Sequence, residues 1–171
     1  MHLRAFTERD AVEICAWRYP EPYDVYNQPA WNTVRASGEG IASAEKRASE
    51  FFAVEESDCL IGYFRLHFRN GALTLGLGMR PDACGQGQGK ELLSLAIETA
   101  QKRYGAQPLF LEVRTFNLRA IRCYHTAGFS AIGTSERFTQ TGTVPFIRMK
   151  LSSEDAPRLP LERHKKDAPQ N

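Results

Sequence analysis

The sequence predicts a mixed α/β fold with a central, mostly antiparallel sheet, one parallel strand pair and flanking helices on both faces. Apolar runs between residues 51 and 79 are joined by tight turn patterns, of which Asn70-Gly71 is the strongest, and such connections make antiparallel hairpins. A glycine-rich turn at 85–89 then opens an amphipathic helix that leads into the apolar strand 109–113. A strand, helix, strand series of this kind gives a parallel pair with a right-handed crossover.

The N-terminal region is expected to contain a short strand at residues 3–6, a helix and an ordered loop. Thr7 and Asp10 have the spacing of a capping box for a helix that ends near residue 17. Three prolines between residues 20 and 29 exclude a long helix from the next stretch, which is nevertheless rich in aromatic side chains. Tyr23, Tyr26 and Trp31 suit recognition of a cationic amine, or they simply pack against the edge of the core. Both interpretations remain open.

The rest of the chain alternates predicted helices and strands. A short helix is expected at 42–48, a second helix is capped by Asn117 and stopped by Gly128, and strands are expected at 129–138 and 144–151. Residues 152–171 are polar and lack periodicity, which is typical of a disordered tail. We therefore expect a single domain at 1–151.

Composition limits the classes of function. The chain has 171 residues and a net charge of +2, so it favours neither a nucleic-acid-binding nor a membrane-surface protein. No apolar run is long enough to span a membrane, and the first residues lack the apolar core of a signal peptide. The four cysteines lack metal-type spacing and the four histidines are scattered, so we expect reduced thiols, no metal and a cytoplasmic location. A monomer and a homodimer fit the sequence equally well.

The glycine-rich stretch from Cys84 to Leu93 is the strongest candidate for a binding site. Alternate glycines at 85, 87 and 89 allow positive φ angles and remove side chains from the inner face of the loop. Successive N–H groups can then converge at the N-terminus of the following helix, which suits a phosphate or pyrophosphate. An ordinary strand-to-helix turn explains the glycines equally well.

Two other phosphate motifs do not fit this stretch. The spacing is G-x-G-x-G rather than the G-x-G-x-x-G of dinucleotide-binding folds. Glu91 follows Gly89-Lys90, so the Ser or Thr that binds magnesium in nucleoside-triphosphate loops is missing.

Three further residues suggest chemistry. Glu112 is an acid within an apolar strand, where it either forms a salt bridge, with Arg114 or Arg119, or lines a cleft and acts as a base. Asn117 and Tyr124 lie two helical turns apart on the same side of one helix. A phenol at this position can donate a proton to a leaving thiolate, although core packing also explains Tyr124.

Residues 51–151 resemble the GNAT superfamily of acetyl-coenzyme A-dependent N-acetyltransferases. The resemblance rests on the glycine loop followed by Leu92-Leu93, on Leu111-Glu112-Val113-Arg114, on Asn117-Leu118-Arg119-Ala120 and on Tyr124 through Gly128-Phe129. Segment 111–129 is especially similar to the ribosomal-protein alanine N-acetyltransferases.

The resemblance implies a site for acetyl-CoA as co-substrate, with no metal, and a primary amine as acceptor. Glu112 would be the base, Tyr124 the acid that protonates the coenzyme thiolate, and Asn117 a coenzyme contact. A strand around Leu77 and Met79 would pair with the pantetheine arm and splay from its neighbour. The pyrophosphate would be held by the loop residues Gly85, Gln86, Gly87, Gln88, Gly89 and Lys90.

Two features depart from the family pattern. Cys84 occupies a position where the family usually has Gln or Arg, and this removes a polar partner for phosphate. The stretch from Tyr19 to Trp31 differs from the ribosomal-protein enzymes, so the acceptor is left open between a small-molecule amine and a protein N-terminus. A catalytically inactive acyl-CoA-binding or regulatory module is the alternative function.

Overall fold

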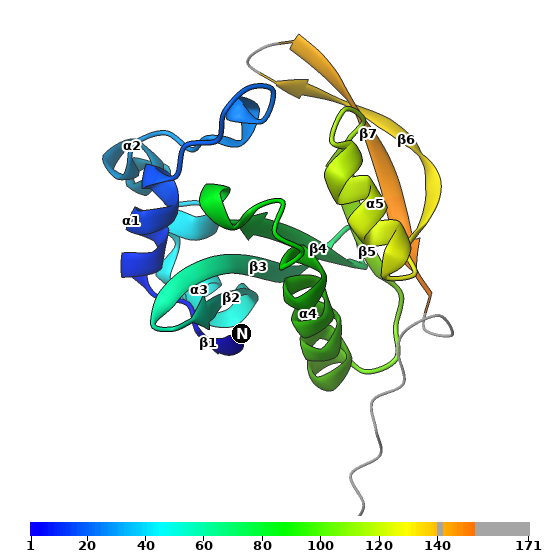
Figure 1. Ribbon diagram of the computed structural model, residues 1–171, viewed down its shortest axis with the longest axis horizontal. Coiled ribbons are helices and arrows are strands. Elements are labelled where there is room, and N and C mark those ends of the chain that lie inside the picture. The colour runs from blue at the N-terminus through cyan, green and yellow to red at the C-terminus, as the bar shows by residue number, and fades with distance from the viewer. Residues whose placement is uncertain (140–141, 153–171) are drawn as a thin grey trace, which may run out of the picture.

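Seven strands form one sheet in the order β1-β2-β3-β4-β5-β7-β6 (Figure 1). The computed structural model describes residues 1–139 and 142–152. The strands are β1 (His2–Ala5), β2 (Phe51–Glu56), β3 (Cys59–Arg69), β4 (Ala72–Met79), β5 (Leu109–Arg114), β6 (Ser130–Thr139) and β7 (Gly142–Leu151). Among these described strands only β4 and β5 pair in parallel, which confirms the predicted fold class.

Helices lie on both faces of the sheet. They are α1 (Glu8–Ala16), α2 (Trp31–Ala36), α3 (Ala44–Glu50), α4 (Gly89–Tyr104) and α5 (Leu118–Thr126), with short 3-10 turns η1 (Asp24–Tyr26), η2 (Gly40–Ala42) and η3 (Pro81–Ala83). Neighbouring side chains of the strands alternate between two cores. On β2, Val54 belongs to the main core with α4, whereas Phe51 and Ala53 belong to a smaller core with α1.

Local sequence patterns account for much of this order. The Thr7 hydroxyl accepts from the Asp10 N–H, and the Asp10 carboxylate accepts from the Thr7 N–H at 2.7 Å, so the capping box is confirmed. Asn70 and Gly71 both have positive φ, as the predicted hairpin turn requires. The helix predicted at 42–48 corresponds to α3, which lies slightly later, at Ala44–Glu50. Helix α2 was not predicted. The predicted tail at 152–171 lies almost entirely outside the described residues.

The parallel pair separates after two residues. Leu73 pairs with Leu109 and Thr74 with Phe110, and no further pairing joins the two strands along their fully described lengths. From Leu75 onward, β4 has no strand partner on its β5 side. Backbone polar groups along that edge are therefore available to a ligand, apart from the Met79 carbonyl, which accepts from the Tyr19 hydroxyl.

Gly78 serves packing rather than a bulge. Glycines within a strand can mark a bulge, but β3 and β4 pair without a register shift from Gly62 to Arg69, so Gly76 and Gly78 mark none. A Cβ atom on Gly78 would lie 2.3 Å from the Tyr63 ring, so that ring excludes any side chain there. On Gly76 a Cβ atom would meet only the Arg65 Cβ, at 3.8 Å.

The described residues contain no helix that is both long and apolar enough to cross a membrane. Within residues 1–139 and 142–152, no three His, Cys, Asp or Glu side chains are grouped to hold a metal ion.

Candidate active site

A cavity of about 560 Å³ opens where β4 and β5 separate. Its walls come from the splayed halves of both strands, the glycine loop, α5 and the segment between α1 and α2. Segments from widely separated parts of the sequence thus meet at one site, and most of the sequence-predicted residues line it.

Two glycines of the loop adopt the left-handed backbone conformation that the sequence predicted. Gly85 and Gly87 adopt φ angles of +82° and +83°, and a Cβ atom at either position would meet nothing within 4 Å. Gly89 instead begins α4, and its Cα faces Cys123, whose sulfur would lie 3.7 Å from a Cβ atom. The prediction of positive φ is therefore confirmed for the first two glycines and wrong for Gly89, which has helical geometry.

The side chains of Gln86 and Gln88 are bonded elsewhere. Gln86 Nε2 donates to the Asp82 carbonyl at 2.7 Å, and Gln88 Nε2 donates to a Glu56 carboxylate oxygen at 2.9 Å. The amide nitrogens of both side chains are thus engaged within the protein.

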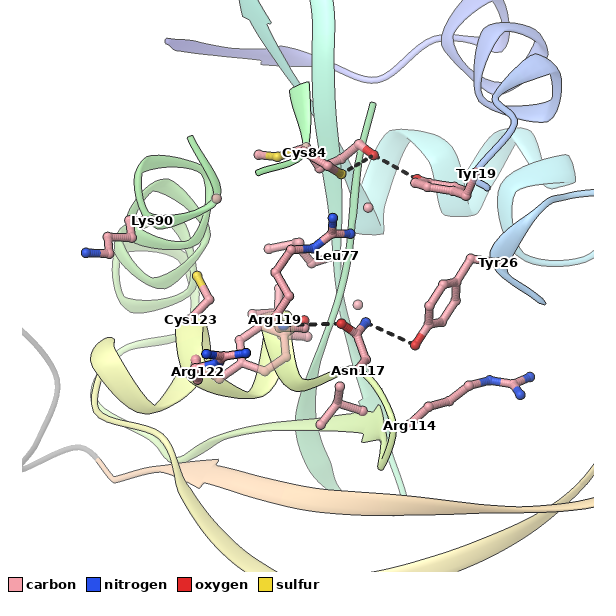
Figure 2. Close-up of a pocket in the computed structure, with 18 of the residues that line it drawn as sticks. Tyr19, Tyr26, Leu77, Cys84, Lys90, Arg114, Asn117, Arg119, Arg122 and Cys123 are labelled. Atoms are coloured by element: carbon pink, nitrogen blue, oxygen red, sulfur yellow. Dashed lines mark hydrogen bonds between the residues drawn. The ribbon is translucent and has the colours of Figure 1, made fainter. Parts of the chain in front are cut away.

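Basic side chains gather at the loop end of the cavity. Lys90 lines this end together with Arg119 and Arg122 of α5, which lie on one face of the helix because they are three residues apart. Figure 2 shows Lys90, Arg122 and Cys123 on the same side of the site. Sequence reasoning did not identify the two arginines as site residues, although their spacing after Asn117 was visible.

Cys84 is half-buried and lies close to Arg119. Burial raises the pKa of the Cys84 thiol, and the charge of Arg119 opposes that rise. The cationic partner that Cys84 fails to supply at the start of the loop can therefore come from α5. Burial also raises the pKa of Cys123, again opposed by a cation, Lys90.

Tyr19 contacts the strand edge on which the pantetheine arm was predicted to lie. Its hydroxyl donates to the Met79 carbonyl at 2.8 Å, and the Cys84 sulfur lies 3.8 Å from the same oxygen. Both Leu77 and Met79 line the cavity. Nothing in the sequence pattern singled out Tyr19, because this contact spans 60 residues.

Asn117 caps α5 and also reaches across the site (Figure 2). Its Oδ1 accepts from the Ala120 N–H at 3.2 Å, while its Nδ2 donates to the Tyr26 hydroxyl at 3.1 Å. The predicted cap is confirmed. The hydrogen bond to Tyr26 joins the N-terminal loop to the helix that lines the cavity.

Tyr124 lines the cavity from α5, and its ring packs 6.0 Å from that of Phe129. Burial raises the pKa of the Tyr124 phenol well above its ordinary range, and proximity to Cys123 and Tyr26 adds to the rise. The phenol is therefore protonated at neutral pH, which is the state a proton donor needs.

Glu112 lines the cavity and is ion-paired. Its carboxylate contacts the Arg69 guanidinium at 3.1 Å and that of Arg137, and the Ser135 hydroxyl lies 3.5 Å away. Burial, and then repulsion from Arg69, lower the pKa of Arg137. The sequence analysis named Arg114 or Arg119 as the alternative partner. The structure instead supplies arginines from β3 and β6, which strand pairing brings to this face.

The three aromatic residues proposed for the acceptor occupy different positions. Tyr26 lines the cavity. Tyr23 lies beside it, with its ring 5.9 Å from Phe116 and the Arg119 guanidinium 4.5 Å from its centre. Trp31 packs against the smaller core, away from the cavity lining, and Arg47 lies over its ring.

A model of the acetyltransferase (GNAT) family matches residues 10–129. The chain belongs to this family. The match confirms the resemblance inferred from the glycine loop and the segment 111–129, and it starts before them, at the capping box of α1.

Solved structures with this fold include three amine acetyltransferases. The Escherichia coli ribosomal-protein-S18-alanine N-acetyltransferase is 23% identical, with a TM-score of 0.63 over 88% of this chain and 94% of that one. The Vibrio cholerae spermidine N-acetyltransferase in complex with CoA and spermine is 19% identical, with a TM-score of 0.64 over 90% and 96%. An aminoglycoside acetyltransferase in complex with coenzyme A is 22% identical, with a TM-score of 0.69 over 90% and 95%. No curated protein matches the sequence. At these identities the similarity establishes the fold alone.

Proposed function

We propose that this protein is an acetyl-CoA-dependent N-acetyltransferase that transfers an acetyl group directly to a primary amine. The observation that carries the proposal is the cavity between the separated strands. It joins a glycine loop with cationic neighbours to a partly buried, protonated phenol and to a carboxylate. A phosphate seat, a proton donor and a proton acceptor along one cavity fit this reaction.

The chain offers a matching group for each part of the coenzyme. The loop N–H groups at the N-terminus of α4 suit the pyrophosphate. Lys90, Arg119 and Arg122 add positive charge for the phosphates. The edge of β4 from Leu75 to Met79, which has no strand partner on its β5 side, suits the amides of pantetheine.

The proposed reaction is a single displacement at the acetyl carbonyl carbon. The neutral amine forms a C–N bond as the C–S bond breaks. Tyr124 gives its proton to the departing sulfur, and Glu112 takes a proton from the amine, directly or through water. Both residues line the cavity, so a substrate within it can reach each of them.

The ion pairs of Glu112 set a condition on its role as base. A carboxylate held by two guanidiniums is stabilised as an anion and gives up some of its ability to accept a proton. Glu112 therefore acts as the base only if acceptor binding loosens its contact with Arg69 or Arg137.

A covalent acetyl-cysteine route is disfavoured by the two thiols in the cavity. Nucleophilic attack needs a thiolate, and burial raises the pKa of both Cys84 and Cys123. Direct attack by the amine requires neither of them.

An acyl-CoA-binding module without catalysis is the second candidate, and specific contacts favour it. The Met79 carbonyl accepts a hydrogen bond from the Tyr19 hydroxyl, and the Asn117 amide donates one to the Tyr26 hydroxyl. Two groups that are expected to contact the coenzyme therefore already have partners within the protein. The Cys84 side chain also lacks the polar or cationic group that would contact a phosphate.

Two measurements on the purified chain separate the candidates. Calorimetric titration with acetyl-CoA tests the coenzyme site, and a thiol-release assay over a panel of primary amines tests transfer. Amine-dependent thiol release supports the enzyme. Binding without release for any amine supports the module, and the absence of binding contradicts both.

A further inference from the structure

The face of β5 that carries Glu112 also carries a group of basic residues. Leu109, Leu111 and Val113 are buried in the main core, so Phe110, Glu112 and Arg114 point to the opposite side of the sheet. Directly paired residues of antiparallel strands share a face. The register therefore adds three β7 residues to this face: Lys150 opposite Phe110, Arg148 opposite Glu112, and Phe146 opposite Arg114.

Positive charge dominates this surface, which we call the arginine face. It consists of Arg69, Glu112, Arg114, Arg137, Arg148 and Lys150. By strand register, Glu112 is the only acid that the described parts of β5, β6 and β7 place there, since Glu136 faces the other way opposite Pro145. Arg69 and Arg137 share that single carboxylate. The remaining cations exceed the acids on this face, although the whole chain has a net charge of only +2.

Arg114 brings this charge into the cavity wall. Its guanidinium lies 5.9 Å from the ring centre of Tyr26 and 5.6 Å from that of Phe146, and all three residues line the cavity. Among residues 1–139 and 142–152, no carboxylate pairs with Arg114. Two aromatic rings thus hold a guanidinium that lacks an anionic partner among the described residues.

Arg114 lies away from Lys90 and Arg122, two of the three cations assigned to the coenzyme, whereas the third, Arg119, lies over the Tyr23 ring. Figure 2 shows Tyr26 and Arg114 together on one side of Asn117, with Lys90, Arg122 and Cys123 on the other. The phosphates of the coenzyme belong at the glycine loop, next to Lys90 and Arg122. The free guanidinium of Arg114 is consequently left to the acceptor.

We propose that the acceptor is a primary amine that carries a carboxylate group, which Arg114 binds at the arginine face. This inference rests on the proposed acetyltransferase function and specifies its substrate class. The planar guanidinium binds carboxylates through two parallel hydrogen bonds, which would orient the amine as well as attract it. The cations that line the cavity, Lys90, Arg114, Arg119 and Arg122, disfavour polyamines and aminoglycosides by like-charge repulsion. A free amino acid and a peptide whose N-terminal residue has an acidic side chain both present a primary amine together with a carboxylate.

The test compares each acceptor with its own carboxamide in the thiol-release assay. The panel contains amino acids, short acidic peptides, their amides and spermidine. We expect kcat/KM to be about tenfold to a hundredfold higher for carboxylates than for amides, which is what one charge-assisted contact supplies. The relative kcat/KM values for free amino acids and for peptides show which of the two is the preferred acceptor. Equal rates for acids and amides, or preferred use of spermidine, would overturn the proposal.

Matched arginine variants locate the effect. Arg114→Gln should abolish the preference for carboxylates and leave acetyl-CoA affinity unchanged. Arg103→Gln is the control, because Arg103 also lies over aromatic rings, those of Phe52 and Tyr104, but outside the cavity. A loss of acetyl-CoA affinity in Arg114→Gln, with the acceptor preference retained, would assign Arg114 to the coenzyme instead.

A binding measurement keeps this proposal separate from the catalytic one. N-acetyl derivatives of the same acids and amides are titrated into the protein saturated with coenzyme A. If no amine releases thiol but the N-acetyl acids bind in an Arg114-dependent way, the carboxylate site stands and the transferase proposal fails. If neither thiol release nor binding distinguishes acid from amide, the carboxylate site is refuted.

Discussion

The Asn117 side chain joins two segments that are 91 residues apart, because its amide nitrogen donates to the Tyr26 hydroxyl at 3.1 Å while its oxygen caps α5. One residue therefore stabilises the helix and anchors the loop over the cavity. The two tasks use different atoms, so they can be separated by mutation.

Substitutions at Asn117 should separate the role of its oxygen, which caps α5, from that of its amide nitrogen, which donates to Tyr26. Asn117→Ala removes both and should lower the free energy of unfolding by about 1 kcal/mol or more. Asn117→Asp keeps an oxygen that caps a helix N-terminus and should retain most of that stability, while it removes the N–H donor, so that the Tyr26 hydroxyl must donate instead of accept. Urea unfolding measures the difference. Equal destabilisation by Ala and Asp would contradict the capping role.

Tyr124→Phe should lower kcat about a hundredfold, because the proton donor is lost, while acetyl-CoA affinity stays within about threefold. The ring and its contact with Phe129 are preserved. Single-turnover kinetics and calorimetry measure the two quantities. Unchanged turnover in the variant would exclude the general-acid role.

The pH profile tests Tyr124 in a second way. Burial raises the pKa of this phenol above its ordinary value of 10.0, so the proton remains bound as the pH rises from 7 to 9. We therefore expect no alkaline loss of kcat from Tyr124 over this interval in the native enzyme. A decline in that range that disappears in Tyr124→Phe would show that the phenol deprotonates earlier than its burial implies.

Glu112→Gln tests the proposed base with little change in shape. If Glu112 accepts the amine proton, kcat should fall about a hundredfold or more. Ser135→Ala is the control, since it removes only the neutral partner 3.5 Å from the carboxylate. A variant with nearly native kcat but altered stability would mean that Glu112 serves only its ion pairs with Arg69 and Arg137.

Two glycines on β4 form a matched pair for stability. Gly78→Ala places a Cβ atom 2.3 Å from the Tyr63 ring and should cost about 1–3 kcal/mol of stability, as overpacking does. Gly76→Ala meets only an ordinary contact at 3.8 Å and should cost less than about 1 kcal/mol. Denaturant unfolding compares them directly. Similar costs at both positions would refute the packing role of Gly78.

Structural features that depend on residues close together in the sequence were predictable. The capping box of Thr7 and Asp10, the turn at Asn70-Gly71 and the cap at Asn117 each depend on local backbone geometry, which spacing alone specifies. The glycine loop was identified in the same way, and together with the spacing of Asn117, Ala120, Tyr124 and Gly128-Phe129 it indicated the family.

Tertiary structure decided what depends on contacts between distant strands. Sequence spacing cannot show that Arg69 and Arg137 reach Glu112, because β3 and β6 bring them there through sheet order. The contact of Tyr19 with Met79 spans 60 residues, and its geometry depends on how the N-terminal loop folds over the sheet. Local propensity thus determined most of the secondary structure elements, though not α2, and the position of the candidate coenzyme loop. Only the packed fold determined the charge of the acceptor face, since that charge results from side chains gathered on one side of the sheet.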